Sequence, residues 1–201
     1  RVKEVEYELR KRDNAKGAQG FSSQDVMYLI MPDRFARSGN VTDAEAAKTL
    51  NFPVPVDRAN PNARHGGNIA GMRDKLDYIN DLGVTAVWVN PVLLNDMPGG
   101  SYHGYATTDY YRIDPRFGTN EEWNDFVKEA HKRDLKVIMD MIFNHSGSHH
   151  EWAKDYPTKD WYNFPDTFVQ TNYRLSTGYD PYVSEYDKKR TVDGWFVRSM
   201  P

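Results

Sequence analysis

The chain has 201 residues, a formal net charge of −3 and no cysteine. Its length allows one domain, or one domain with an insertion, while the missing cysteine excludes disulfides and thiolate metal sites. The weak negative charge gives no electrostatic reason to expect nucleic acid or an acidic membrane as a partner, and no apolar run in the sequence approaches the roughly 20 residues that cross a bilayer.

The first 24 residues are rich in charge and contain the polar run KRDNAKGAQG, which is typical of a linker. We predict that residues 1–24 are the end of a preceding domain and a linker. Because the sequence begins without Met and without an apolar signal segment, we expect either a mature form or a piece of a longer protein.

Apolar strands alternate with amphipathic helices in the part that follows. Strands are predicted at 26–31, 85–90 and 136–141, because each is an apolar run of strand length. A first helix is predicted from Ile69 to Leu82, with Gly83 as its C-terminal stop. Its apolar face comprises Ile69, Met72, Leu76 and Ile79.

A second helix is predicted to begin at a capping box, with Thr119 at the N-cap and Glu122 three residues later. Its buried stripe comprises Trp123, Phe126, Val127 and Ala130, at the spacing of one helix face. The loops after the strands are long, whereas the segments from helix to strand, DLGV and KRDL, are short.

This alternation predicts a parallel sheet covered by helices. The long loops at the carboxyl ends of the strands favour a (β/α)8 barrel, of which the chain would hold the first three β/α units. A doubly wound open sheet has the same local pattern and stays open as the alternative. No G-x-G-x-x-G follows the first strand, which argues against a dinucleotide site there.

Polar side chains follow the third strand at its carboxyl end. Asp140 comes near the end of an apolar run, and Asn144 and His145 follow closely. In a barrel these groups would lie at the mouth, where an aspartate accepts bonds from hydroxyls and an imidazole donates one. The alternative is an aspartate that only ties down a loop.

A second polar cluster follows the second strand, in SYHGYATTDYY, with His103 and Tyr105 on either side of Gly104. The glycine allows a close approach of the backbone, and aromatic rings in polar surroundings suit stacking on a flat ligand. An ordinary loop histidine is the alternative for His103. His149 and His150 together with His145 offer a metal-dependent hydrolase as a further alternative, although Gly147 disfavours the helix that their spacing would need.

Four ordered motifs carry a resemblance to a known family: MPDRFA, LDYINDLGVTAVWVNPV, SYHGYATTDYYRIDPRFGT and DMIFNH. Over about residues 26–201 the chain resembles the α-amylase family, glycoside hydrolase family 13, and within it most closely the cyclomaltodextrinase and neopullulanase branch. The resemblance implies a retaining α-glucan hydrolase with a (β/α)8 barrel and an irregular B domain inserted after the third strand. It assigns residues 25–145 to the barrel and 146–201 to the B domain, before a fourth strand.

The resemblance also implies roles for individual residues. Asp140 and His145 would hold the glucose ring at the cleavage subsite, and His103 and Tyr105 would lie beside and under it. Asn144 would bind a structural calcium or brace its loop. Asn40, Asp43 and Asn68 are the remaining candidates for calcium ligands, although Asn68 stands where the branch has an Asp. Calcium is the one cofactor implied, and no organic cofactor is expected.

The catalytic acids of the family come from strands four and five and from the segment after strand seven, and no acid of this chain matches their motifs. We therefore expect the chain to supply sugar-binding residues but no catalytic carboxylate, and to be inactive alone. The partner expected is an α-glucan, with a homodimer considered for the full-length protein and a periplasmic or extracellular location favoured over the cytoplasm. The alternative function is a non-catalytic glucan-binding module.

Overall fold

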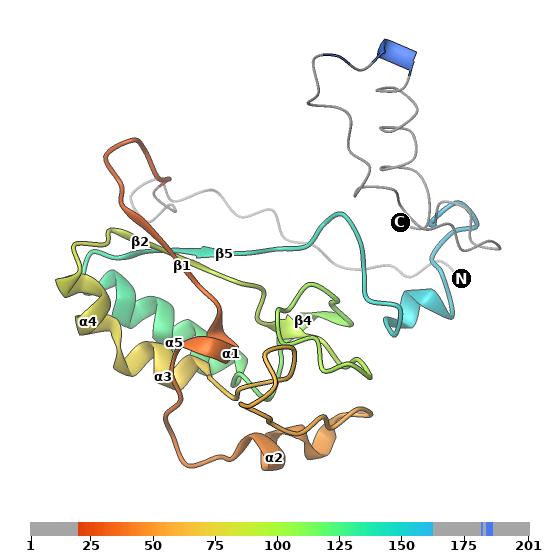
Figure 1. Ribbon diagram of the computed structural model, residues 1–201, viewed down its shortest axis with the longest axis horizontal. Helices are drawn as coiled ribbons and strands as arrows, with labels where there is room; N and C mark the ends of the chain where they lie inside the picture. The colour runs from red at the N-terminus through yellow and green to blue at the C-terminus, as the bar shows by residue number, and fades with distance from the viewer. Residues whose placement is uncertain (1–19, 163–181, 183, 187–201) are drawn as a thin grey trace, which may run out of the picture.

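The computed structural model describes residues 20–162, 182 and 184–186. Most of the predicted N-terminal linker and most of the predicted B domain therefore lie outside the described residues. Within the described part, a parallel sheet with helices on one face forms the core, and the loops that follow its strands extend to one end of it (Figure 1).

The sheet has the strand order β1-β2-β5, with β1 at Met27–Ile30, β2 at Ala86–Val89 and β5 at Lys136–Met139. Both pairings are parallel, and Leu29, Trp88 and Ile138 lie side by side in the register. The three strands coincide with the three predicted apolar runs, each shorter by one or two residues at its ends. Parallel strands in chain order place the loops after β1, β2 and β5 at one edge of the sheet.

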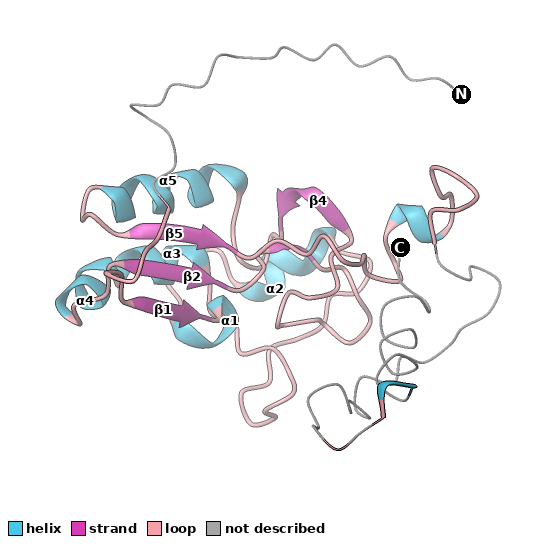
Figure 2. Ribbon diagram, turned by 90° about the horizontal axis from the view of Figure 1, so that it is seen from above, coloured by secondary structure: helices cyan, strands magenta, loops and turns pink. Residues whose placement is uncertain are grey.

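Three helices cover one face of this sheet (Figure 2): α3 (Ile69–Asp74), α4 (Leu76–Asp81) and α5 (Asn120–His131). The apolar side chains between the helices and the sheet are fully or almost fully buried, and removing them from water is the main source of stability. This core includes Ile30, Ile69, Met72, Leu76, Ile79, Val87, Val89, Phe126, Ala130 and Leu135.

The predicted first helix is divided in two. Its four-residue apolar face is 0 % exposed throughout, as the spacing predicts. The helix is interrupted at Lys75, whose backbone angles, φ −105° and ψ 10°, are not helical. Gly83 follows α4 at φ +78°, the left-handed conformation that ends many helices and that glycine adopts without strain.

The capping box of the second helix is confirmed. The Thr119 hydroxyl accepts a bond from the Glu122 amide at 3.1 Å, and the Glu122 carboxylate accepts one from the Thr119 amide at 2.9 Å. Phe126 and Ala130 are fully buried, whereas Trp123 and Val127 pack at the margin of the core.

Short elements occupy the long loops. The loop after β1 contains α1 (Pro32–Phe35), α2 (Asp43–Ala46) and a 3-10 turn, η1 (Ala47–Thr49). The loop after β2 contains the antiparallel pair of β3 (Leu93–Leu94) and β4 (Asp109–Ile113), which the sequence did not predict. A second 3-10 turn, η2 (Glu151–Ala153), follows β5. β3 has only two residues, and the five residues of β4 do not alternate between buried and exposed positions.

The second face of the sheet is uncovered among the described residues. Leu29 is 56 % exposed and Trp88 39 %. The prediction of a buried third strand is accordingly wrong for this structure: all four residues of β5 are only half-buried. The reason is its position, because β5 is an edge strand of the described sheet and has helices on one side alone.

Three parallel strands in chain order occur in a barrel and in half of a doubly wound sheet, so the sheet alone does not separate the two predicted architectures. No helix among the described residues is both long and apolar enough to pass through a bilayer.

Candidate functional site

The two predicted polar clusters meet at the carboxyl ends of β2 and β5. Asp140 follows β5 directly, and its amide donates to the Val89 carbonyl at 3.1 Å, so the strand pairing continues up to the aspartate. The loop that carries His103 and Tyr105 leaves β2 and returns to this position. Its Thr107 carbonyl accepts a bond from the Gly147 amide at 2.7 Å, which ties the loop to the segment after His145.

Asp140 is the centre of the cluster. Its Oδ2 accepts a hydrogen bond from the Tyr105 hydroxyl at 2.9 Å and another from the Trp88 indole Nε1 at 3.1 Å. Burial, followed by the bond to Asp140 and its negative charge, raises the pKa of Tyr105 above its usual value, so the phenol stays protonated and donates.

Trp88 was missed by the sequence analysis, which treated it only as part of an apolar strand. The signal that could have found it is the period of two along a strand. Ile138 is paired with Trp88, and Asp140 lies two residues beyond Ile138 on the same face. An indole N–H on that face therefore comes within reach of the carboxylate.

His145 lies against the same loop. Its Nε2 is 2.8 Å from the Tyr105 carbonyl oxygen, and its Nδ1 is 3.2 Å from the Asn144 side-chain amide nitrogen. Because a carbonyl only accepts hydrogen bonds, the proton belongs on Nε2, and Nδ1 accepts from Asn144. The His145 side chain thus holds the backbone of Tyr105, whose hydroxyl bonds to Asp140.

His103 stacks on Tyr105, with ring centroids 5.8 Å apart and planes at 26°. Its Nδ1 accepts a bond from the Tyr105 amide at 3.0 Å, which leaves the proton of the neutral ring on Nε2. Burial lowers the pKa of His103 below its ordinary value, so the neutral form is favoured at neutral pH. The Gly104 between them is at φ +84°, and a Cβ there would lie 2.1 Å from the Pro91 carbonyl oxygen, which is the close approach expected of this glycine.

Two of the candidate calcium ligands around the loop after β1, Asp43 and Asn68, bond to other groups of the protein. Asp43 pairs with the buried Arg64 at 3.2 Å. Asn68 is the N-cap of α3, and its Oδ1 accepts bonds from the Gly71 and Ser38 amides. Asn40 is exposed. Asp43 Oδ1 and Asn68 Oδ1 are thus bonded within the protein in this structure, and calcium binding at these residues stays a prediction.

The histidines after His145 have other partners. His149 packs edge-on against Phe52 with centroids 4.7 Å apart, and the Nδ1 of the buried His150 accepts the Trp152 amide at 3.0 Å. Across the residues with defined positions, no group of three or more His, Asp or Glu side chains is placed to hold a metal ion. The geometry gives the metal-hydrolase alternative no support.

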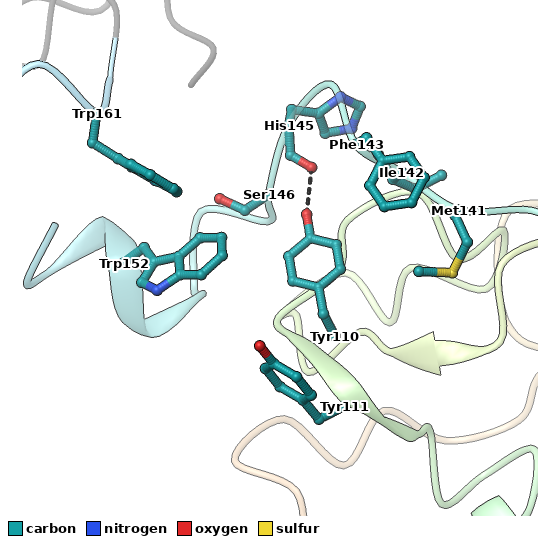
Figure 3. Close-up of a pocket in the computed structure, with 9 residues that line it drawn as sticks. All are labelled: Tyr110, Tyr111, Met141, Ile142, Phe143, His145, Ser146, Trp152 and Trp161. Carbon is teal, nitrogen blue, oxygen red and sulfur yellow. Dashed lines mark hydrogen bonds between the residues drawn. The ribbon is translucent and has the colours of Figure 1, made fainter. Parts of the chain in front are cut away.

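An aromatic pocket of about 550 Å³ lies next to the cluster and shares His145 with it (Figure 3). It is lined by Tyr110, Tyr111, Met141, Ile142, Phe143, His145, Ser146, Trp152 and Trp161. The Tyr110 hydroxyl donates to the His145 carbonyl at 2.7 Å across its floor. The pocket is formed largely by residues of the segment after β5, and it lacks the convergent polar groups found at Asp140. We therefore place the functional site at Asp140.

Comparison with known proteins identifies the family. Residues 29–197 match the family described as "Alpha amylase, catalytic domain". The chain is 38 % identical over 123 residues to "Alpha-amylase 3" of Dictyoglomus thermophilum. The aligned part covers 56 % of this chain and 24 % of that protein. The chain is 36 % identical over 130 residues to a cyclomaltodextrinase of Thermoanaerobacter pseudethanolicus, which covers 65 % and 21 %.

Among solved structures, the crystal structure of an Anoxybacillus α-amylase superposes with a TM-score of 0.65 at 32 % identity, covering 88 % of this chain and 34 % of that one. The chain belongs to the α-amylase catalytic-domain family. This membership confirms the resemblance found in the sequence and decides the fold class in favour of part of a (β/α)8 barrel. The chain spans about a quarter of the length of these curated relatives.

Proposed function

We propose that the chain is part of a retaining α-glucan hydrolase that acts on α-1,4-glucosidic bonds, and that it contributes the residues that hold one glucosyl ring. The observation that carries the proposal is the meeting of Asp140, Tyr105, His103 and His145 at the strand ends, in a chain of a family whose named relatives include α-amylases and a cyclomaltodextrinase.

The chemistry of the cluster suits a sugar. Both bonds that Asp140 receives within the described part of the chain end on Oδ2, so Oδ1 is available to accept from sugar hydroxyls. His103 has a donor on Nε2, and the Tyr105 ring, 38 % exposed, offers an aromatic face for the apolar side of a pyranose. We infer that the hydroxyls bind to Asp140 and His103 while the ring packs on Tyr105. A hydroxyl reaches His145 by replacing the Tyr105 carbonyl on Nε2 or the Asn144 amide on Nδ1.

Cleavage needs more than the cluster contains. A retaining glycosidase uses a carboxylate nucleophile and a carboxylic acid about 5 Å apart, whereas Asp140 is the one carboxylate among the four clustered residues. We propose that both catalytic acids belong to the larger part of the enzyme that the relatives possess and that this chain does not match. In this account Asp140 binds substrate and does not form a covalent bond with it.

Residues 146–201 are proposed to be the B domain of this enzyme, beginning directly after His145. A calcium ion on Asn144 would need further oxygen ligands from that domain, most of which lies outside the described residues. The expected substrates are maltooligosaccharides and cyclodextrins, in line with the relatives named α-amylase and cyclomaltodextrinase.

The test is the release of reducing sugar from maltooligosaccharides and cyclodextrins, measured in parallel for the 201-residue chain and for the longest protein that contains it. Activity of the longer protein alone is the expected result. Turnover by the short chain would overturn the assignment of the catalytic acids and would make Asp140 the first candidate nucleophile.

A non-catalytic glucan-binding module is the second candidate, and the observation that favours it is the single carboxylate in the cluster. The same measurement separates the two functions. If neither protein releases sugar but both bind maltooligosaccharide, the binding function is correct and the hydrolase proposal is wrong.

A further inference from the structure

We propose that Asn95 is a positioning residue: its buried side chain fixes the loop that presents His103 and Tyr105 to the sugar. This inference rests on the proposed function for its effect on turnover. Asn95 follows β3 and is 1 % exposed, so it cannot touch the substrate and acts only through the loop.

The Asn95 side chain uses its full hydrogen-bonding capacity on this loop and its own strand. Oδ1 accepts from the Ala106 amide at 2.7 Å and from the Ser101 hydroxyl at 2.6 Å. Nδ2 donates to the Gly104 carbonyl at 3.1 Å and to the Leu93 carbonyl at 3.0 Å. A primary amide has two donors and two acceptor positions, and all four are used.

Three of these four bonds enter the segment 101–106, on both sides of the two candidate sugar-binding residues. Gly104 lies between His103 and Tyr105, and Ala106 follows Tyr105. No other side-chain type of this size offers two donors and two acceptors from one planar group, so the loop conformation depends on an asparagine at this position.

Asn95 is itself held from the opposite side by a buried ion pair. The backbone amide of Asn95 donates to Asp114 Oδ2 at 3.2 Å, and the backbone carbonyl of Asn95 accepts from Arg116 Nη2 at 2.9 Å. Asp114 and Arg116 join at 2.6 Å with both side chains 0 % exposed. A continuous chain of bonds therefore runs from this ion pair through Asn95 and the loop to the Tyr105 hydroxyl on Asp140.

The experiment compares Asn95→Ala with Asn120→Ala in the longest protein that contains the chain. Asn120 is a matched control, because its side chain also makes two bonds to loop or strand backbone, with the Ile113 amide at 2.8 Å and the Tyr111 carbonyl at 3.1 Å, away from residues 101–106. A small displacement of positioning groups costs on the order of 10- to 100-fold in rate. We expect Asn95→Ala to lower kcat/KM on maltooligosaccharides by about that factor and Asn120→Ala to change it less than about twofold.

A double-mutant comparison separates positioning from general damage. If Asn95 acts through His103 and Tyr105, its substitution should have little further effect in a His103→Ala/Tyr105→Ala background. An equal loss in both backgrounds, or the same loss for Asn95→Ala and Asn120→Ala, would overturn the proposal. Should Asn95→Ala fail to fold, Ser101→Ala removes one of the four bonds and should lower kcat/KM in the same direction by a smaller factor.

Amide hydrogen exchange keeps this inference separate from the proposed function. Asn95→Ala should speed exchange at Ala106, and Asn120→Ala should instead speed it at Ile113. A wild-type protein with no activity on any α-glucan would contradict the proposed function alone, whereas unchanged exchange at Ala106 would contradict the role of Asn95.

Discussion

At the scale of single residues, the site depends on which hydrogen bonds each of the two Asp140 carboxylate oxygens accepts. Oδ2 receives both the Tyr105 hydroxyl and the Trp88 indole, which fixes the plane of the carboxylate. Oδ1 receives no hydrogen bond within the part of the chain that the structure describes. One oxygen thus orients the group and the other can accept from a ligand, as the proposed sugar-binding role requires.

Removing the Tyr105 hydroxyl tests this division. Tyr105→Phe keeps the ring for stacking and deletes one of the two bonds that orient the carboxylate. Since misplacing a binding group by about 1 Å costs on the order of 100-fold in rate, we expect kcat/KM on maltooligosaccharides to fall by roughly 10- to 100-fold. Tyr78→Phe, at an exposed position on α4, is the control and should leave kcat/KM unchanged. Equal values for both variants would contradict the role of the hydroxyl.

A second prediction concerns the buried His150. Burial lowers its pKa below the ordinary value of 6.5, although the negative charges of Asp109 and Glu151 act to raise it. The unfolded chain therefore binds a proton more readily than the folded one, and the stability held by the neutral ring is complete above about pH 6.5 and is lost as the pH falls below it.

His150→Asn should reduce this pH dependence, because an asparagine oxygen can still accept the Trp152 amide but does not titrate in this range. The measurement is the midpoint of thermal unfolding between pH 7 and pH 5. The midpoint should fall less steeply for the variant than for the wild type. Parallel curves would show that another group causes the acid sensitivity.

At the scale of elements, α5 illustrates how a local signal sets a boundary. Its capping box satisfies donors that the helix leaves free at its start, and loss of such a cap costs about 1 kcal/mol. Thr119→Ala should lower the free energy of unfolding by about that amount in a urea titration. Thr42→Ala removes the equivalent box of the four-residue α2 on the surface. We expect a smaller loss there, because α2 packs less of the core, and the reverse order would contradict this account of α5.

The buried pair of Asp114 and Arg116 directly follows β4 and bonds to the Asn95 backbone after β3. Burial raises the pKa of Asp114, but the bonds and charge of Arg116 outweigh it and leave this pKa below its usual range. Arg116→Met would leave an unpaired buried carboxylate, which costs about 3–5 kcal/mol in unfolding free energy. Lys128→Met breaks the exposed pair with Asp125 and should cost less than about 1 kcal/mol. Similar losses for the two variants would show that the buried pair is not special.

The elements also show how far the sequence predicts the fold. Long apolar or amphipathic segments were located correctly, because burial selects their spacing. The break at Lys75 and the β3–β4 pair were not predicted, since tertiary contacts decide them and neither is marked by a hydrophobic period. Asp140 and Tyr105 were named from polar chemistry after a strand, and the structure brings them together, while their binding of a sugar stays a prediction. Trp88 was missed because its bond to Asp140 depends on strand pairing. Asn95 was missed because most of its side-chain partners are backbone groups, which no residue pattern in the sequence reveals.

At the scale of the whole molecule, the candidate site lies at the end of the sheet face that no described residue covers. Trp88 and Ile138 are on that face, and Asp140 continues it beyond the strand. The family assignment accounts for this arrangement, because in a (β/α)8 barrel one face of the sheet carries the helices and substrates bind at the carboxyl ends of the strands. The uncovered face then belongs to the barrel interior, and the candidate sugar-binding residues lie at its mouth.

The most direct test of the central claim is a crystal structure of the longest protein that contains this chain, with a maltooligosaccharide bound. We predict a glucosyl ring packed against Tyr105, with hydroxyls within hydrogen-bonding distance of Asp140 and of His103 or His145. A sugar bound in the aromatic pocket beside Trp152 and Trp161, with Asp140 untouched, would contradict the account.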